Sequence, residues 1–202
     1  MNEQELFWAK RYAADYMLKN HEFNIQKGMT AWKQMLAKAE EVESILECGC
    51  NIGRNIEMLN ATHPDAAKSV IEISEPAFNF VTKKYALRES FNGSIVESQL
   101  NHQYDLVFTC GVLIHIHPDY LVDNLKKMVQ YSRRYILIAE YFNRTSVSLK
   151  YQGEDDKLFK SDYGRTFLKH FDYKCIDNGF LWGFNFDDAG FDDITWWLFE
   201  KK

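Results

Sequence analysis

The sequence predicts an α/β fold in which a doubly wound, largely parallel sheet is covered by helices on both faces. Short apolar segments alternate with amphipathic helical segments from residue 44 to residue 141, and this is the order that a parallel sheet with crossover helices requires. The segment YDLVFTC at 104–110 is apolar almost throughout, which is typical of a strand that is covered on both faces.

The composition indicates one domain. The chain has 202 residues, of which 46% are hydrophobic and 26% charged, and a single domain usually holds roughly 100 to 200 residues. Its 10 Gly and 3 Pro leave little room for a low-complexity linker. We therefore expect a single domain over 1–202, with a helical lobe at 1–40 and an insertion at 142–160.

Charge and cysteine content argue against several functional classes. A net charge of −5 disfavours nucleic-acid binding through the electrostatic attraction of the whole domain. No apolar run approaches the roughly 18 residues of a membrane span, and the charged start MNEQELFWAKRYAADY is unlike a signal peptide. The 4 Cys form no C-x-x-C pair, so neither a disulfide framework nor a metal site is supported. We expect a cytoplasmic protein with reduced thiols, and the sequence does not set its oligomeric state.

The first half of the chain contains the first strand–turn–helix unit. Apolar spacing predicts helices at 3–20 and 26–39. SILEC at 44–48 is a strand that leads through a glycine-containing turn into the helical pattern RNIEMLNA. The strand SVIEIS at 69–74 is followed by a helix that begins at Glu75 and Pro76, because Pro is tolerated in a first helical turn.

The second half continues the alternation and ends differently. Strands are expected at 91–95, 104–110 and 134–141, with helices from Pro118 to about Tyr131 and at 161–171. The insertion at 142–160 is polar and has no clear periodicity. The last segments, YKCIDNGFLW and DDITWWLFEK, predict an antiparallel pair at the sheet edge. Most of the eight aromatic residues from Phe180 to Phe199, which include Trp182 and Phe184, are expected in the core.

The turn after the first strand is the strongest indication of a ligand site. Ligands of open α/β sheets bind at the carboxyl ends of the strands, and Gly49 and Gly53 allow the backbone to approach a ligand closely. Asn51 and Arg54 stand where a dinucleotide fingerprint requires glycines, so a pyrophosphate fits poorly. Glu47 would repel phosphates but can bind an ammonium group. The turn therefore favours an amino acid-like ligand.

A second acidic residue, Glu72, ends the second strand. A carboxylate at this place can accept hydrogen bonds from both hydroxyls of a ribose. A ribose together with an ammonium group suggests a conjugate of a nucleoside and an amino acid.

These features together resemble the class I S-adenosylmethionine-dependent methyltransferases, through an acidic residue before G-x-x-x-G, the acidic end of the second strand, and YDLVFTCGVLIHI. The resemblance implies a Rossmann-like sheet of seven strands with an antiparallel last strand, and S-adenosyl-L-methionine as cofactor. The chain is most similar to the pseudaminic acid biosynthesis-associated methylases, through LFWAKRYAADYMLKN, ILECGCNIGRNIEML, FTCGVLIHIHPDYL, RYILIAEYFN and DDITWWLFEK. That branch implies a small-molecule acceptor, such as an acidic sugar or its nucleotide conjugate.

The resemblance also implies a set of cofactor-binding residues. They are Trp8, Tyr16, Glu47, Gly49, Cys50, Asn51, Gly53, Arg54, Glu72, Ile73, Ser94, Ile95, Cys110 and Gly111. Trp8 and Tyr16 are expected to form a lid, although packing of the first helix is an alternative role. Ser94 departs from the family pattern, since many class I enzymes place there an Asp that contacts the adenine amino group. We expect Ser94 and the backbone of Ile95 to substitute for it.

Three residues near the carboxyl ends of the fourth and fifth strands are candidate catalytic residues. His115 is the preferred proton acceptor if the methyl acceptor is a hydroxyl, although an H-x-H before Pro118 could equally cap the next helix. Glu140, the rival proton acceptor, and Tyr141 end a very apolar strand, where a carboxylate is costly unless it is paired or belongs to a site. Two other functions stay open: a non-catalytic protein that binds S-adenosylmethionine or S-adenosylhomocysteine, and a nicotinamide-dependent oxidoreductase.

Overall fold

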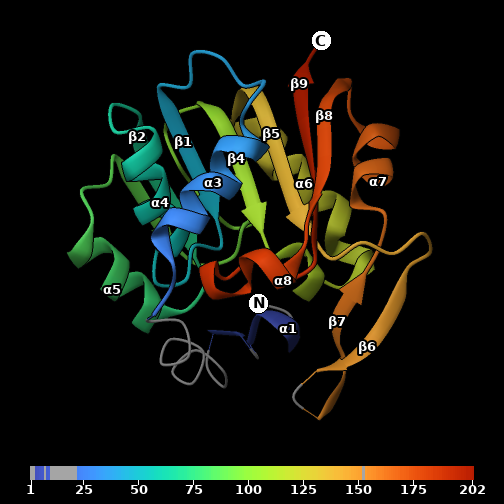
Figure 1. Ribbon diagram of the computed structural model, residues 1–202. Helices are drawn as coiled ribbons and strands as arrows, with labels where there is room; N and C mark the ends of the chain where they lie inside the picture. The colour runs from blue at the N-terminus through green and yellow to red at the C-terminus, as the bar shows by residue number, and fades with distance from the viewer. Residues whose placement is uncertain (1–2, 7, 10–21, 152) are drawn as a thin grey trace.

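A computed structural model describes residues 3–6, 8–9, 22–151 and 153–202. Figure 1 shows a central twisted sheet with helices on both of its faces. Of the helix expected at 3–20, the described part is α1, Glu3–Leu6, and the short segment 8–9. The remainder, including Tyr16, lies outside the described residues.

Seven strands form the central sheet, in the order β3-β2-β1-β4-β5-β9-β8. The last strand, β9, pairs antiparallel with both β5 and β8, while the pairs from β3 to β5 are parallel. This confirms the doubly wound, Rossmann-like sheet with an antiparallel last strand. The strands are β1 (Ser44–Cys48), β2 (Ala67–Glu72), β3 (Glu89–Asn92), β4 (Tyr104–Cys110), β5 (Ser132–Glu140), β8 (Tyr173–Leu181) and β9 (Ile194–Lys201).

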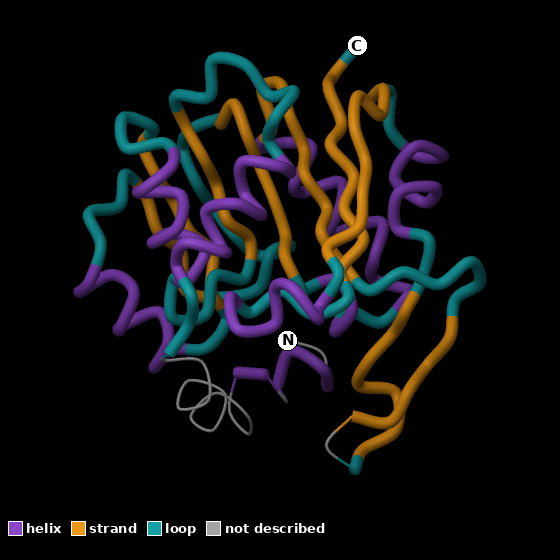
Figure 2. Tube along the Cα trace, in the orientation of Figure 1, coloured by secondary structure: helices purple, strands orange, loops and turns teal. Residues whose placement is uncertain are grey.

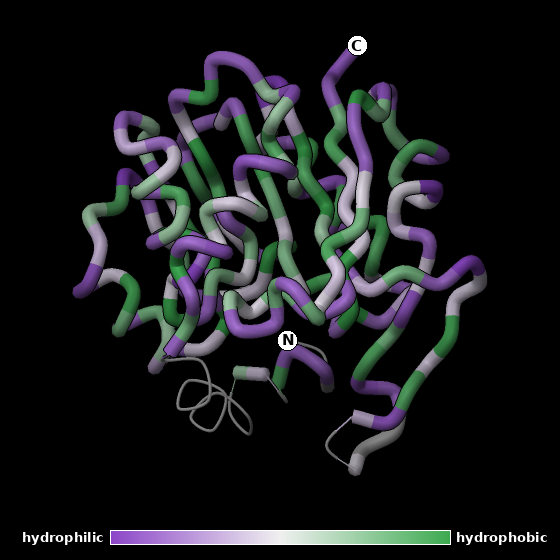
Figure 3. Tube along the Cα trace, viewed as in Figure 1, coloured by the Kyte–Doolittle hydropathy of each residue, from purple (hydrophilic) through white to green (hydrophobic). Residues whose placement is uncertain are grey.

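Helices cover the sheet in two layers. On one face, α3 and α4 pack on the sheet through a cluster that contains Trp32 and Leu59, and on the other face α6 and α7 pack through Leu125 and Phe167. The central strands β1, β4 and β5 between them are largely apolar, as Figure 3 shows. The helices are α3 (Ile25–Met35), α4 (Arg54–Thr62), α5 (Glu75–Lys84), α6 (Pro118–Tyr131), α7 (Tyr163–His170) and α8 (Gly183–Phe186), with short 3₁₀ turns η2 (Leu113–His115) and η3 (Asp187–Ala189).

Polar side chains begin several of these helices. Asn24 accepts a hydrogen bond from the backbone N–H of Lys27, and Ser74 accepts one from that of Ala77. Such caps satisfy backbone donors that have no partner within the helix. The cap at Ser74 begins α5 two residues after Glu72 ends β2.

The third strand ends earlier than predicted. It covers Glu89–Asn92 rather than 91–95, because β3 is an edge strand that pairs only with β2, and its last partner is Glu72 opposite Asn92. Ser94 and Ile95 therefore lie in the loop beyond the strand and not within it.

The insertion at 142–160 contains a β-hairpin. Its strands, β6 (Val147–Tyr151) and β7 (Glu154–Lys160), form a separate antiparallel pair that projects past the carboxyl edge of the main sheet (Figure 2). Only a few hairpin side chains are buried, among them Leu158 and Phe159. The hairpin lacks the alternating pattern of a half-buried strand because so little of it packs against the domain.

The expectation that the C-terminal aromatic residues are mostly core is wrong for three of them. Phe191, Trp196 and Phe199 are buried, but Phe180, Trp182 and Phe184 are 52%, 54% and 76% exposed. The rings of Trp182 and Phe184 stack at a centroid distance of 4.9 Å. These three residues are exposed because β8 is the edge strand and α8 is a short surface turn. Separately, none of the described helices is long and apolar enough to span a membrane.

Two glycines, Gly53 after β1 and Gly111 after β4, give a prediction about stability. Gly53 (φ 77°) and Gly111 (φ 67°) both have left-handed backbones. A Cβ added at Gly53 would lie 2.6 Å from Tyr85 Cε2 and 2.7 Å from Val81 Cγ2. A Cβ added at Gly111 would have none of the described atoms within 4 Å. Gly111→Ala should therefore cost about 1 to 2 kcal/mol of unfolding free energy, from the backbone alone. Gly53→Ala should cost about 1 to 3 kcal/mol more, from overpacking. Urea unfolding of both variants measures the difference, and equal losses would contradict this account.

Candidate functional site

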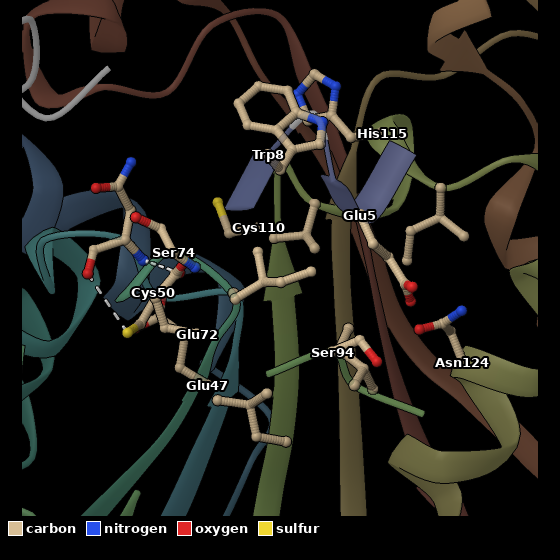
Figure 4. A pocket seen from close by; sticks show the side chains of 18 of the residues that line it. Glu5, Trp8, Glu47, Cys50, Glu72, Ser74, Ser94, Cys110, His115 and Asn124 are labelled. Atoms are coloured by element: carbon tan, nitrogen blue, oxygen red, sulfur yellow. Dashed lines mark hydrogen bonds between the residues drawn. The ribbon is translucent and has the colours of Figure 1, made fainter. Parts of the chain in front are cut away.

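A pocket opens at the carboxyl ends of β1, β2 and β4 (Figure 4). The strand order places β1 between β2 and β4. The connection from β1 runs to one side, whereas the connection from β3 returns to the other side of β1, and ligands of doubly wound sheets bind at such a point. The pocket brings together most of the predicted site residues. Those in its lining are Trp8, Glu47, Gly49, Cys50, Asn51, Arg54, Glu72, Ile73, Ser94, Ile95, Cys110, Gly111 and His115.

The turn after β1 forms the floor of the pocket. Gly49 has φ 82° and Asn51 has φ 47°, so the chain turns sharply, and the N–H of Gly49 donates to the carbonyl of Ile71 at 2.7 Å. A Cβ at Gly49 would lie 2.6 Å from Val112 Cγ2. Glycine at position 49 is therefore required both for the backbone conformation and for the close approach of the segment that follows β4.

Glu47 is a buried carboxyl group, and only one of its two oxygens has a hydrogen-bond partner among the described residues. It is 1% exposed; Oε1 accepts a hydrogen bond from Asn55 Nδ2 at 2.7 Å, and Oε2 has no partner among the described residues. Burial raises the pKa of Glu47 to about 8, against the opposing effects of Asn55 and Arg54. Glu47 therefore holds its proton to a higher pH than an exposed carboxyl group does, and a bound cation would favour its ionised form.

Two amide oxygens lie in the same region of the pocket. Oδ1 of Asn51 and Oδ1 of Asn55 are buried and, among the described residues, have no hydrogen-bond donor. Buried polar groups of this kind normally have a partner. Arg54 follows directly in the chain, and its Nη2 donates to the carbonyl of Gly190 at 2.8 Å. This end of the pocket offers acceptors for an ammonium group and a guanidinium for a carboxylate.

Glu72 is held at the end of β2 by two backbone donors. Its Oε2 accepts the N–H of Asn51 at 2.6 Å, and its Oε1 accepts the N–H of Ser74 at 2.7 Å. Burial raises the pKa of Glu72, although these backbone hydrogen bonds oppose the shift. Carboxylate oxygens have further lone pairs, so Glu72 can still accept hydroxyl donors from a ligand in the pocket.

The opposite end of the pocket is bounded by polar groups from three elements. Ser94 Oγ donates to Glu97 at 3.0 Å, and Asn124 Nδ2 donates to the carbonyl of Tyr120 at 2.8 Å. In Figure 4 the Glu5 side chain reaches toward the same end as Ser94 and Asn124. The hydroxyl oxygen of Ser94 and the amide oxygen of Asn124 can still accept hydrogen bonds at this end. Recognition of an amine requires such acceptors.

His115 lies at the pocket wall next to the hairpin. Its Nδ1 is 3.0 Å from the backbone carbonyl of Lys157; because a carbonyl only accepts, Nδ1 carries the hydrogen and Nε2 the lone pair. The Trp8 ring is 4.1 Å away, centroid to centroid, and the Tyr151 ring 5.3 Å. Burial lowers the pKa of His115 to about 4. His115 is thus a neutral imidazole at pH 7.

Gln4 joins three segments beside this wall. Its Oε1 accepts the N–H of His117 at 2.7 Å, and its Nε2 donates to the carbonyl of Asp156 at 2.9 Å. The N-terminal segment, the hairpin and the start of α6 are thereby connected. His117 itself caps α6, since its Nδ1 accepts the N–H of Asp119 at 3.3 Å.

Three of the predicted site residues do not line the pocket. Gly53 packs against α5, and the Tyr141 hydroxyl donates to Asp192 at 3.0 Å. Glu140 is fully buried, and its two oxygens accept backbone N–H groups of the segment after β4. Because its carboxylate is fully buried and does not line the pocket, this geometry does not support Glu140 as the rival proton acceptor. Tyr16 lies outside the described residues.

Sequence reasoning missed part of the lining. The residues are Gln4, Glu5, Ile52, Asn55, Ile71, Ser74, Gly93, Val112, Ile116 and Asn124. A signal existed for Asn55 and Asn124, since each is an amide in the apolar stripe of an amphipathic helix, where a buried polar side chain needs a partner. Gln4 and Glu5 carry no such signal. The described residues contain no group of three or more His, Cys, Asp or Glu able to hold a metal ion.

The comparisons with known proteins place this geometry among methyltransferase folds. The sequence matches no protein-family model and no curated protein. Its structure is similar to that of a Burkholderia thailandensis 1,6-didemethyltoxoflavin-N1-methyltransferase with bound 1,6-didemethyltoxoflavin and S-adenosylhomocysteine, with a TM-score of 0.71, 13% identity, and coverage of 98% of this chain and 87% of that one.

Two other solved structures give the same result. An S-adenosylmethionine-dependent methyltransferase from Clostridium acetobutylicum has a TM-score of 0.67 at 13% identity, with 95% and 98% of the two chains covered. The N-methyltransferase NodS from Bradyrhizobium japonicum, in complex with S-adenosyl-L-homocysteine, has a TM-score of 0.67 at 14% identity, with 98% and 99% covered. At these identities the similarity establishes the fold, and this chain has the fold of these methyltransferases.

Proposed function

We propose that this protein transfers a methyl group from S-adenosyl-L-methionine to a small-molecule acceptor. The observation that carries the proposal is the set of buried oxygens without hydrogen-bond donors on Glu47, Asn51 and Asn55, with Arg54 beside them. An ammonium group has three donors and a neighbouring carboxylate needs a cation, so an α-amino acid fits this end of the pocket.

The remaining pocket suits the nucleoside part of the same molecule. Glu72, at the end of β2, is placed to accept two ribose hydroxyls, and the loop with Ser94 and Ile95 follows the next strand. Similar folds solved with S-adenosylhomocysteine bound support this assignment. A pyrophosphate would meet the carboxylates of Glu47 and Glu72 instead of a glycine-rich helix start, which disfavours a nicotinamide cofactor.

The chemistry then needs little from the protein beyond placement. S-adenosylmethionine supplies a methyl group that is already activated on a sulfonium. The chain's residues hold the acceptor in line and exclude water, and Trp8 and His115 are placed to do so at the wall beside the hairpin. Nε2 of His115 can accept the proton of an acceptor hydroxyl. Because its pKa is about 4, His115 orients that hydroxyl more than it drives its ionisation.

An acidic sugar or its nucleotide conjugate is the acceptor class that we propose. The support is the resemblance of FTCGVLIHIHPDYL, RYILIAEYFN and the other segments to the pseudaminic acid biosynthesis-associated methylases. The aromatic rings of Trp8 and Tyr151, whose centroids are 6.0 Å apart beside His115, are also compatible with a ring-shaped acceptor. The fold is shared by methyltransferases whose acceptors differ, so the acceptor must be tested directly.

Calorimetry with three ligands tests the cofactor. We expect saturable one-to-one binding of S-adenosylmethionine and S-adenosylhomocysteine and none of NAD. Glu72→Gln should weaken S-adenosylhomocysteine binding by tenfold or more, because it loses charge-assisted acceptors. Glu89→Gln is the matched control: Glu89 is also multiply hydrogen-bonded but lies at the start of β3, at the opposite edge of the sheet. Binding of NAD in place of the other two ligands would overturn the proposal.

The pKa of Glu47 predicts how this binding depends on pH. The free carboxyl has a pKa of about 8, and the ligand's ammonium lowers it, so binding near pH 7 releases a proton. The affinity for S-adenosylhomocysteine should therefore rise from pH 6 to pH 7.5, by at most about tenfold per pH unit. Calorimetry in two buffers of different ionisation enthalpy measures the proton release. Glu47→Gln should remove most of this slope, and an unchanged slope would rule Glu47 out as its source.

His115 can be separated from cofactor binding. His115→Ala should lower methyl transfer by about 10- to 100-fold, while the dissociation constant for S-adenosylhomocysteine changes less than about threefold. Turnover is followed as S-adenosylhomocysteine formed with a panel of sugars, nucleotides and small acids. His117→Ala is the matched control, because this side chain caps α6 and does not line the pocket. Equal turnover in His115→Ala and wild type would remove His115 from the mechanism.

If no compound in a broad acceptor panel yields S-adenosylhomocysteine while the cofactor binds, the non-catalytic alternative becomes the better description.

A further inference from the structure

Glu140 contacts a backbone segment that carries pocket residues. It ends β5, and its carboxylate is fully buried. Oε1 accepts the N–H groups of Val112 at 3.1 Å and Leu113 at 3.0 Å, and Oε2 accepts that of Ile114 at 3.3 Å. All three donors belong to the segment that leaves β4 and forms η2, so one side chain of β5 holds three consecutive backbone groups of that segment.

These hydrogen bonds satisfy both the backbone donors of η2 and the buried carboxylate of Glu140. The first N–H groups of a helical turn have no partner within the turn, and a buried carboxylate is costly without hydrogen bonds. Parallel pairing of β4 with β5 sets Cys110 opposite Ala139, so the next residue of β5 lies beneath the start of η2. Successive N–H groups of a turn form a concave site for an anion, and here the anion is part of the chain.

The same segment presents its other side to the pocket. Val112, His115 and Ile116 line the pocket, and Val112 closes against Gly49. His115 is fixed at its far side by the carbonyl of Lys157, and His117 N–H by Gln4. Glu140 therefore holds the beginning of a segment whose later residues are held by the hairpin and the N-terminal segment.

We propose that Glu140 is a positioning residue, whose carboxylate fixes η2 so that His115 keeps its Nδ1–H on the Lys157 carbonyl and its Nε2 toward the pocket. The inference rests on the proposed role of His115. It assigns Glu140 an indirect part in methyl transfer, in place of the proton transfer expected from the sequence. The titratable groups that face Glu140 are Cys110 and Tyr163, and burial raises the pKa of both, so they stay neutral between pH 5.5 and pH 8. Burial also raises the pKa of Glu140 itself to about 7, so its carboxylate is ionised at the upper end of this range.

NMR of the histidine rings in the ligand-free full chain tests the inference. The ¹⁵N shifts report the tautomer, and His115→Ala identifies the signal. At pH 7.5 to 8, where Glu140 is ionised, His115 of the wild type should be the unprotonated Nδ1–H tautomer. In Glu140→Gln, the side-chain amide presents N–H groups to the backbone donors, so η2 loosens and water reaches the ring. His115 should then titrate with a pKa above 5.5, and the Nε2–H tautomer should become populated.

Two further variants make the test decisive. Glu140→Asp keeps the charge but shortens the side chain by one methylene, and it should shift His115 in the same direction by a smaller amount; it decides the question if Glu140→Gln does not fold. Glu89→Gln removes a carboxylate that accepts the N–H of Asn101 and the hydroxyl of Tyr104, and it should leave His115 unchanged. A His115 signal that stays wild-type in a folded Glu140 variant overturns the proposal.

The outcome is independent of cofactor binding. The measurement uses no ligand, so a wild-type protein that fails to bind S-adenosylhomocysteine would defeat the proposed function without altering the NMR result. In a folded Glu140→Gln variant that retains its cofactor site, the dissociation constant for S-adenosylhomocysteine should change less than about fivefold, because Glu140 does not line the pocket.

Discussion

Three buried carboxyl groups at the carboxyl edge of the sheet organise the candidate site. Glu47, Glu72 and Glu140 lie at or next to the ends of β1, β2 and β5, where the strands emerge from an apolar core. Each must be compensated, because a buried charge without partners is strongly destabilising. The number of hydrogen-bond donors that each carboxyl group has within the protein differs, and this difference distinguishes a structural carboxyl group from one that can bind a ligand.

Glu140 accepts hydrogen bonds from three backbone donors, and Glu72 from two. Glu47 has one amide donor and an oxygen with no donor among the described residues. Burial raises the pKa of Glu47, which has the fewest donors, to about 8, and that of Glu140 to about 7. A ligand with an ammonium group would complete what the protein leaves open at Glu47, whereas Glu140 needs none.

The parts that enclose the site come from outside the regular sheet. The N-terminal segment brings Trp8 against His115, and the hairpin brings the carbonyl of Lys157 and the ring of Tyr151. Gln4 ties these segments to the start of α6. The sheet thus positions the residues proposed to bind the cofactor, while elements outside the sheet enclose the remaining pocket, a division that lets one fold serve different substrates.

The sequence by itself determined the order of the main-sheet strands and of the helices between β1 and β5, the antiparallel end of the sheet, and the turn from Glu47 to Gly53, because hydrophobic period and turn glycines are local properties. It could not decide whether Glu140 faces the pocket or the backbone, that β3 stops with β2, or that residues 147–160 pair as a hairpin. Gln4 and Glu5 lay in an ordinary polar stretch. These features depend on contacts between distant segments, and only the tertiary structure brings their partners within hydrogen-bonding distance.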